Sequence, residues 1–214
     1  MALSRRNILV GLGALVGGGG ALVSTGAFST VSAERSVSVN TTGDASSFLG
    51  LNATSQGQSY INNPTSGTLD ISLGSSSNGF NEDAITTIGS LFNIINNSPE
   101  GETIDIAFST NGPSTSGVGT GTDPTIQLGV APNSGGSVNS VVTLAILEGS
   151  SSISDITLNS DGTISNDPNS GNSVSLSVAD SLVPVGVIVD TRDNAINNSS
   201  IPNQNNVTIV AEGQ

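Results

Sequence analysis

The chain is divided into short runs of β-branched and aliphatic residues by clusters of Asn, Gly, Ser and Pro, and no segment carries an apolar stripe at helical spacing. Runs of this kind, bounded by turn-forming residues, are typical of β-strands. Many short strands without helices between them indicate an all-β chain folded as an antiparallel β-sandwich or a related barrel. The expected strands are 34–39, 47–51, 68–73, 90–95, 103–108, 125–130, 138–147, 153–158, 173–178, 182–189 and 207–211.

Two positions predict how particular strands are joined or interrupted. Asp161-Gly162 is a dipeptide that favours a tight turn, so we expect a hairpin there. Pro184 lies inside an expected strand, and because proline donates no hydrogen bond, that strand is expected to be an edge or to carry a bulge. All five Phe residues and the single Tyr precede residue 109. The core of the later half must therefore consist of Val, Ile and Leu.

The residue types that the chain lacks exclude much chemistry. Its 214 residues include no Cys, His, Trp or Lys. Without Cys there is no disulfide, thiol nucleophile or Cys-ligated zinc, and without His the usual general base and zinc ligand are missing. The four arginines, two of them at the N-terminus, are too few to neutralise a run of phosphates. We expect no enzymatic activity, no cofactor and no nucleic-acid partner.

The N-terminus has the pattern of an export signal. Arg5-Arg6 forms a twin-arginine motif, and the moderately apolar run 8–23 follows it. We expect residues 1–27 to be a signal peptide that directs an already folded protein to the outside, where it is secreted or held at the cell surface. The membrane is then a partner only through this segment before cleavage.

Small residues allow cleavage at two positions, after Ala27 or after Ala33. An uncleaved N-terminal anchor is the alternative, although the glycines in the run make it less apolar than a membrane span requires. Cleavage after Ala27 leaves two arginines against 17 acidic residues. A protein whose surface charges are nearly all negative stays soluble where salt screens their repulsion. This favours a protein from a halophile over an ordinary acidic secreted protein.

The segment that follows the signal alternates with a period of two. Its odd positions are Val31, Ala33, Arg35, Val37 and Val39, whereas the even positions between them are polar. This alternation is typical of an extended strand with one buried face. Residues 28–40 are therefore either the first strand of the chain's own sandwich, formed by residues 41–214, or a donor strand that completes the sheet of a neighbouring copy.

Further residues suggest modification or ligand binding. Glycosylation sequons begin at Asn40, Asn52, Asn96, Asn197, Asn198 and Asn206. Acidic residues gather loosely at Asp155, Asp161 and Asp167, at Glu82-Asp83, and at Asp190 and Asp193. None of these groups has the alternating spacing of a calcium loop, so solvated acids and no metal are expected.

Several segments together are similar to a known family. They are the glycine-rich leader 13–20, Thr25–Ser29, the strand Glu34–Val39, Phe48–Leu51, Gly79–Ala84, Leu91–Ser98, Thr103–Phe108 and Val183–Thr191. In these segments the chain resembles the secreted TasA/camelysin-type fibre proteins, and more closely a haloarchaeal branch of surface proteins of unknown function. The resemblance covers roughly 1–110 and 181–191.

The resemblance implies a jelly-roll-like β-sandwich that assembles into extracellular filaments, such as a pilus or a biofilm matrix fibre. It also implies cleavage after Ala27 and a donor strand at Phe28–Asn40 with Val31, Ala33, Val37 and Val39 facing inward. Arg35 interrupts this face and must reach a carboxylate or the mouth of the groove. The expected partner is another copy of the chain, with other filament subunits as further candidates. The alternative function is a monomeric surface module that binds glycan or calcium.

Overall fold

The computed structural model describes most of the chain after residue 47. The described residues are 48–62, 69–73, 79–99, 101–109, 118–119, 121–131, 136–149, 151–169, 171, 173–177 and 182–214. All of them belong to one compact unit, Thr41–Gln214. The expected signal peptide, with Arg5, Arg6 and Ala27, and the expected donor strand, residues 28–40, lie outside the described residues.

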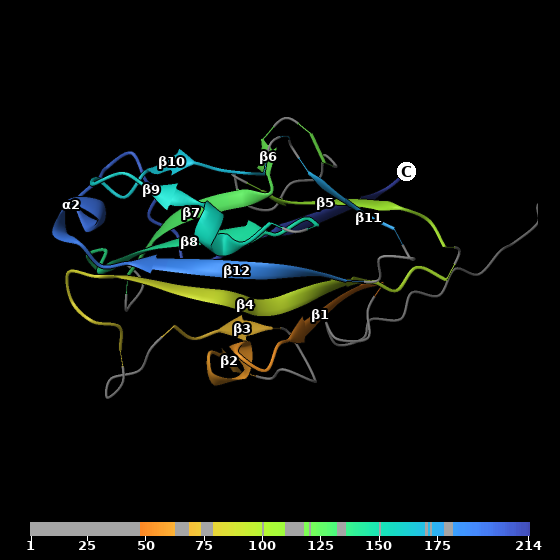
Figure 1. Cartoon of the computed structure of the whole chain (residues 1–214), viewed down its shortest axis with the longest axis horizontal. Coiled ribbons are helices and arrows are strands. Elements are labelled where there is room, and N and C mark those ends of the chain that lie inside the picture. The colour runs from red at the N-terminus through yellow and green to blue at the C-terminus, as the bar shows by residue number, and fades with distance from the viewer. Residues whose placement is uncertain are drawn as a thin grey trace, which may run out of the picture. The chain divides into compact units, whose positions relative to one another are not determined.

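The larger sheet has five antiparallel strands (Figure 1). In spatial order they are β1 (Leu49–Ala53), β4 (Ile85–Asn96), β12 (Leu182–Asp190), β8 (Ser140–Ile146) and β7 (Thr125–Val130). The central strand β12 is almost continuously apolar, and both of its faces are covered. Val183, Val185, Val187 and Val189 point into the main core, whereas Ile188 lies in a second apolar cluster.

The smaller sheet packs on the same core. It contains β11 (Val174–Leu176), β5 (Ile104–Ser109) and β13 (Ile209–Gly213), with the short β6 (Thr122–Asp123) also paired to β5. Pro124 separates β6 from β7, so the chain passes directly from the smaller sheet to the larger one. Both sheets are antiparallel throughout the described part of the chain, which confirms the predicted all-β, sandwich-like fold.

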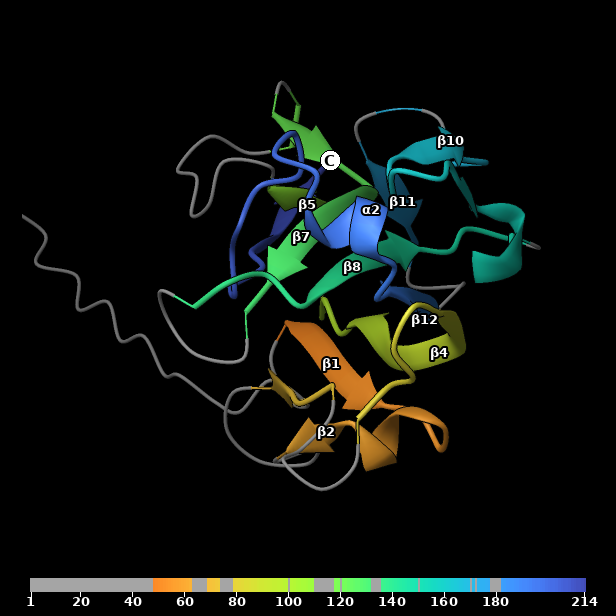
Figure 2. The ribbon, with the colours of Figure 1, turned by 90° about the vertical axis from the view of Figure 1, so that its left-hand side faces the viewer.

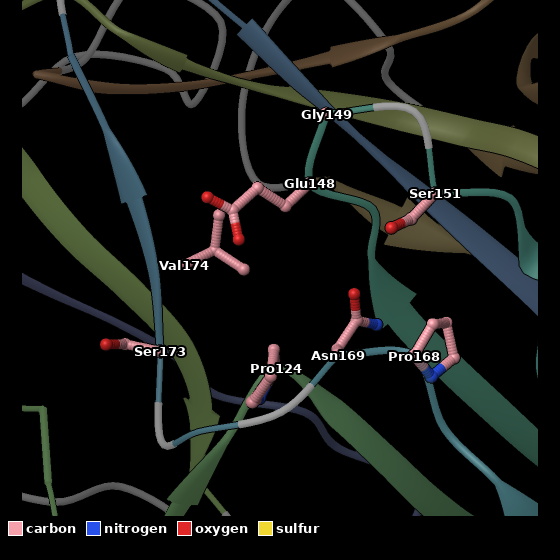
Figure 3. Close-up of a pocket in the computed structure, with 8 residues that line it drawn as sticks. All are labelled: Pro124, Glu148, Gly149, Ser151, Pro168, Asn169, Ser173 and Val174. Atoms are coloured by element: carbon pink, nitrogen blue, oxygen red, sulfur yellow. The ribbon is translucent and has the colours of Figure 1, made fainter.

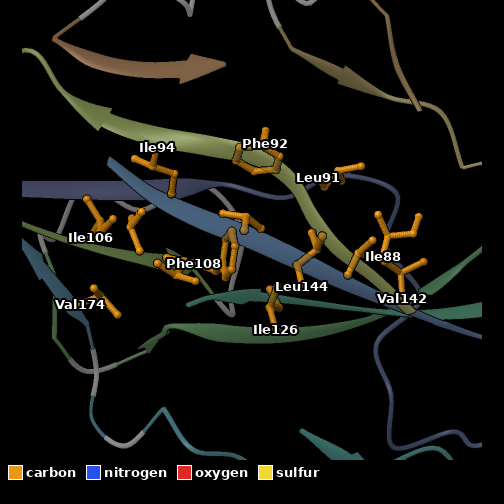
Figure 4. Close-up of a cluster of buried hydrophobic side chains, with 14 of the residues drawn as sticks. Ile88, Leu91, Phe92, Ile94, Ile106, Phe108, Ile126, Val142, Leu144 and Val174 are labelled. Carbon is orange, nitrogen blue, oxygen red and sulfur yellow. The ribbon is translucent and has the colours of Figure 1, made fainter. Parts of the chain in front are cut away.

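The core between the sheets is aliphatic except for a few aromatic side chains (Figure 4). Phe92 of β4 and Phe108 of β5 are its largest fully buried members. Strands β7, β8, β11 and β12 contribute only Ile, Leu and Val to this cluster. The prediction that the later half builds its core without aromatic residues is therefore confirmed.

One segment covers part of the outer face of the larger sheet. It comprises the 3₁₀ turn η3 (Ile153–Asp155) and the hairpin of β9 (Thr157–Leu158) and β10 (Ile164–Asn166). Ile153 and Ile156 pack against Ile188 in the second apolar cluster. The strand expected over 153–158 is partly wrong, because Ser152 and Asp155 form a reciprocal capping box that begins a helical turn. The hairpin at Asp161-Gly162 is confirmed.

Three small elements complete the described structure. The 3₁₀ turn η2 (Gly57–Ser59) precedes a two-stranded sheet of β2 (Ile61–Asn62) and β3 (Asp70–Ile71), and α2 (Asp193–Ile196) follows β12. Figure 2 shows β1 and β2 on one side of β4 and α2 above β12. Within the described residues, no helix has the length and apolar character that crossing a membrane demands.

The strand that contains Pro184 is not an edge, so that alternative is wrong. β12 lies between β4 and β8, in the middle of the sheet. The Pro184 carbonyl accepts a hydrogen bond from the Leu147 amide, and Leu147 lies just past the end of β8, so the missing N–H falls beyond the last rung of that ladder. The bulge alternative agrees with the structure, since the β12–β4 register shifts between Val185 and Val187.

Candidate functional site

An apolar groove opens at one side of the core between the two sheets. It has a volume of about 390 Å³ and is lined by Leu49, Leu51, Leu69, Ile71, Phe92, Phe108, Leu144, Val207, Thr208 and Ile209. Three of its lining residues, Phe92, Phe108 and Leu144, are buried side chains of the main core; Figure 4 shows these three among the other core side chains. The groove is therefore a continuation of the core to the surface.

The walls of the groove come from both sheets. Leu49 and Leu51 of β1, together with Ile71 of the small β2–β3 sheet, line one side, and residues 207–209, which lead into β13, line the other. These wall side chains pack on the core but stay partly exposed. Of all the lining residues, only Thr208 carries a polar side chain, and none is titratable. The groove thus offers apolar contacts and no acid–base chemistry.

The backbone beside the groove offers an unused sheet edge. β13 pairs with β5 through Ile209–Gly213. Along its other edge, no strand of the described part of the chain is paired with it. Unpaired N–H and C=O groups along such an edge are a template for another strand. Together, the edge and the apolar walls can accept an extended segment that has apolar side chains at alternate positions.

The acidic residues that the sequence groups loosely are not gathered into a ligand cage. Asp155 caps η3, Asp161 accepts hydrogen bonds from Thr163 in the β9–β10 turn, and Asp167 accepts one from the Asn169 amide. The hydrogen bonds from Thr163 hold the pKa of Asp161 below its ordinary value. Asp83 takes a left-handed conformation in the turn before β4. Among the described residues, no group of three metal-ligating side chains occurs.

The expectation that the acidic residues are solvated is wrong for Asp190, because its side chain is fully buried. Its carboxylate accepts hydrogen bonds from the Arg192 backbone amide (3.0 Å), Nε (2.9 Å) and Nη2 (2.6 Å). Pairing with Asp190 raises the pKa of the Arg192 guanidinium. Asp193, in contrast, is exposed in the first turn of α2. The sequence offered no signal for this pair beyond the proximity of an acid and a rare arginine.

A second, polar pocket lies near the ends of β8 and β11 (Figure 3). Its lining residues are Pro124, Glu148, Gly149, Ser151, Pro168, Asn169, Ser173 and Val174, and its volume is about 370 Å³. Near it, burial raises the pKa of Asp123, and the negative charge of Asp167 adds to this effect. The pocket offers hydroxyl, amide and carboxylate groups, but no aromatic ring on which a sugar could stack.

The sequons are distributed over several elements. Asn52 lies in β1, Asn96 ends β4, Asn197 and Asn198 follow α2, and Asn206 precedes β13. The sixth, Asn40, lies outside the described residues.

Comparison with known proteins adds no family assignment. No protein-family model matches the chain, and the comparisons with curated proteins and with solved structures found no match. The resemblance to the TasA/camelysin-type proteins therefore stays a prediction. The position and lining of the groove could not be predicted from the sequence, because the residues that line it, near 50, 70, 92, 108 and 208, are far apart along the chain.

Proposed function

We propose that the chain is an exported structural subunit of a cell-surface filament, in which residues 28–40 of one copy occupy the apolar groove of the next. The single observation that carries this proposal is the groove itself, an open extension of the core beside the unused edge of β13. A groove of this kind leaves apolar side chains and unpaired backbone groups exposed to water, which is unfavourable. A strand from a second copy would bury the side chains and pair the backbone groups.

The N-terminal segment has the chemistry that the groove requires. Val31, Ala33, Val37 and Val39 fall on one face of an extended strand, and the walls of the groove are almost entirely aliphatic. Burying each valine contributes about 1.5–3 kcal/mol, and backbone hydrogen bonds to β13 add to this. The sum supports a joint between subunits that dissociates slowly.

Charge is compatible with the same arrangement. After cleavage at Ala27 the chain keeps two arginines, and Arg192 is already bound to Asp190. Arg35 is then the other arginine of the subunit, and Glu212 is an exposed carboxylate on β13. A donor strand beside β13 brings Arg35, together with the α-amino group that cleavage creates at Phe28, to an acidic surface.

The experiment compares two charge-matched variants of the secreted, full-length protein by negative-stain electron microscopy in high salt. Val37→Asp/Val39→Asp places two charges on the inward face and should abolish filaments while the sandwich stays folded. Ser36→Asp/Ser38→Asp places the same charges on the outward face and should leave filaments intact. Equal filament length in both variants would contradict strand donation.

The alternative, a monomeric binding module, has the polar pocket at Glu148 and Asn169 as its candidate site. In that case residues 28–40 close the groove of their own domain, and residues 41–48 connect them to β1. The unmodified protein then stays monomeric at high concentration, and Val37→Asp/Val39→Asp lowers its melting temperature instead of its filament length.

A further inference from the structure

The glycosylation sequons differ in whether the side-chain amide of their asparagine is accessible in the folded protein. A twin-arginine leader directs the export of a folded protein, so an enzyme that transfers sugar outside the cell acts on a chain that is already folded. An acceptor asparagine must then be exposed, with a side-chain amide that no internal hydrogen bond retains. Five of the sequons begin within the described residues and can be judged by this criterion.

The two sequons on the larger sheet do not meet the criterion. The Asn96 side chain is 5% exposed, and its amide donates to the carbonyls of Glu102 (2.8 Å) and Leu176 (2.9 Å). Asn52 is half-buried inside β1, in register with Asn93, and therefore fails on exposure and not on a bound amide. The hydroxyl of its sequon, Thr54 Oγ1, donates to the Ser90 carbonyl (2.6 Å) and accepts from the Gly57 amide (3.0 Å).

The two sequons after α2 have amides that are already bound. The Asn197 amide donates to the Asp193 carbonyl (2.8 Å), which closes the end of the helix. The Asn198 amide donates to the Asp161 carbonyl (3.0 Å) and so connects this turn to the β9–β10 hairpin. The Ser200 hydroxyl, which completes the second sequon, donates to the Asn198 side-chain oxygen.

Asn206 differs from the other four. It is exposed, and its side chain makes no hydrogen bond with any described residue. The backbone of residues 206–208 belongs to no helix, strand or turn. The Thr208 carbonyl accepts a hydrogen bond from the Ser109 amide (2.9 Å), so it is the Asn206 end of this segment that can adapt to a transferring enzyme. The neighbouring Asn205, in contrast, is held by hydrogen bonds in both directions with the Ala131 backbone.

We infer that Asn206 is the N-glycosylated residue among the described sequons. The amide nitrogen bonds to the anomeric carbon of a lipid-phosphate-linked sugar, the bond from that carbon to the phosphate oxygen breaks, and the lipid phosphate leaves. The amide proton goes to a base of the transferring enzyme. Asn206 is not among the residues that line the apolar groove, although Val207, Thr208 and Ile209, which follow it, are.

The test uses the full-length protein secreted by a high-salt host that glycosylates exported proteins. Cleavage before aspartates releases 193–214 as one peptide with three sequons, because no Asp follows Asp193. Fragmentation of this peptide in a mass spectrometer then locates the sugar among its three sequons, and the peptides 44–69 and 83–104 from the same digest report on Asn52 and Asn96. Asn206→Gln and Thr208→Val should each remove the sugar completely, whereas Thr208→Ser, which keeps the sequon, should retain it.

The inference and the proposed function both require export of the chain and are otherwise independent. The possible outcomes therefore distinguish a failure of one from a failure of the other. Sugar on Asn206 and on none of Asn52, Asn96, Asn197 and Asn198 supports the inference. An exported, filament-forming chain with an unmodified Asn206 would overturn the inference alone, as would sugar on any of those four. Sugar on Asn206 of an exported chain that stays monomeric would instead contradict strand donation. A chain that stays in the cytoplasm would overturn the export on which both rest.

Discussion

At the scale of single residues, the buried pair of Asp190 and Arg192 is the most demanding feature of the described structure. The Asp190 side chain is fully buried, whereas the Arg192 side chain is 25% exposed. Arg192 also donates to the Asn159 carbonyl (2.8 Å), so the pair attaches the β9–β10 hairpin to the end of β12. A buried charge is tolerated only while its partner remains, because its desolvation is otherwise uncompensated.

Arg192→Met is therefore expected to lower the free energy of unfolding by about 3 kcal/mol, at the low end for a broken buried pair because the guanidinium is partly hydrated. Denaturant unfolding in high salt measures this loss. Asp190→Asn in the Arg192→Met background removes the orphan charge and should restore part of the stability. A single variant as stable as the unmodified protein would show that water reaches Asp190.

At the scale of elements, the β9–β10 hairpin depends on the close approach of its turn to α2. Gly162 has a φ of +80°, and a Cβ at this position would lie 2.5 Å from the Ala195 Cβ. The Gly162 carbonyl accepts a hydrogen bond from the Gln127 side chain of β7 (2.9 Å). The turn thus needs glycine for its conformation and for the space beside it.

Gly162→Ala should lower the free energy of unfolding by about 2–3 kcal/mol, since left-handed strain and overpacking act together. Gly149→Ala is the matched control, because Gly149 has a φ of +61° and open space around it. The control should lose only about 1 kcal/mol. Thermal unfolding of both variants makes the comparison, and equal losses would contradict the close packing of the hairpin on α2.

Sequence reasoning located most strands but not their ends or all of their partners. β8 and β12 were predictable because both of their faces are covered and their residues are almost continuously apolar, and β7 because Ile126, Leu128 and Val130 alternate with polar or small residues. The first part of β4 was missed, since its inward-facing positions include the polar Thr86 and Ser90 while Ile85 is exposed, so that no apolar alternation marks it. Ile153 and Ile156 suggested a strand although their spacing of three fits the turn that Ser152 caps.

The candidate sites were less predictable than the strands. Burial of Asp190 depends on the hairpin that folds over β12, and local sequence does not report such a contact. The groove depends on which sheet edges remain unpaired, which is a property of topology. From the sequence, only the apolar face of residues 31–39 could be predicted to bind an apolar surface. Where this segment binds remains a prediction.

At the scale of the whole molecule, the charge distribution sets the conditions under which the fold is stable. The sequence has 17 acidic residues and four arginines. Like charges at close spacing repel, and the range of that repulsion falls from about 10 Å at 0.1 M salt to about 3 Å at 1 M. The acidic surface therefore favours folding and association of subunits in concentrated salt.

The melting temperature should rise steadily with salt, with the largest change below about 1 M, where screening lengths shorten most. Thermal unfolding followed by circular dichroism in NaCl and in KCl makes this measurement. The two salts should act alike, because screening does not depend on the identity of the cation. A melting temperature independent of salt, or a response to one cation alone, would contradict general screening.

The most direct measurement of strand donation mixes two full-length chains, each with half of the joint disabled. Val37→Asp/Val39→Asp lacks a usable donor strand, and Ile209→Asp, which puts a charge on the groove wall, lacks a usable groove. Each chain alone should sediment as a monomer in high salt. The mixture should contain one intact donor and one intact groove, and should sediment as a dimer of one copy of each. A mixture that stays monomeric, while the unmodified protein forms filaments, would contradict the account.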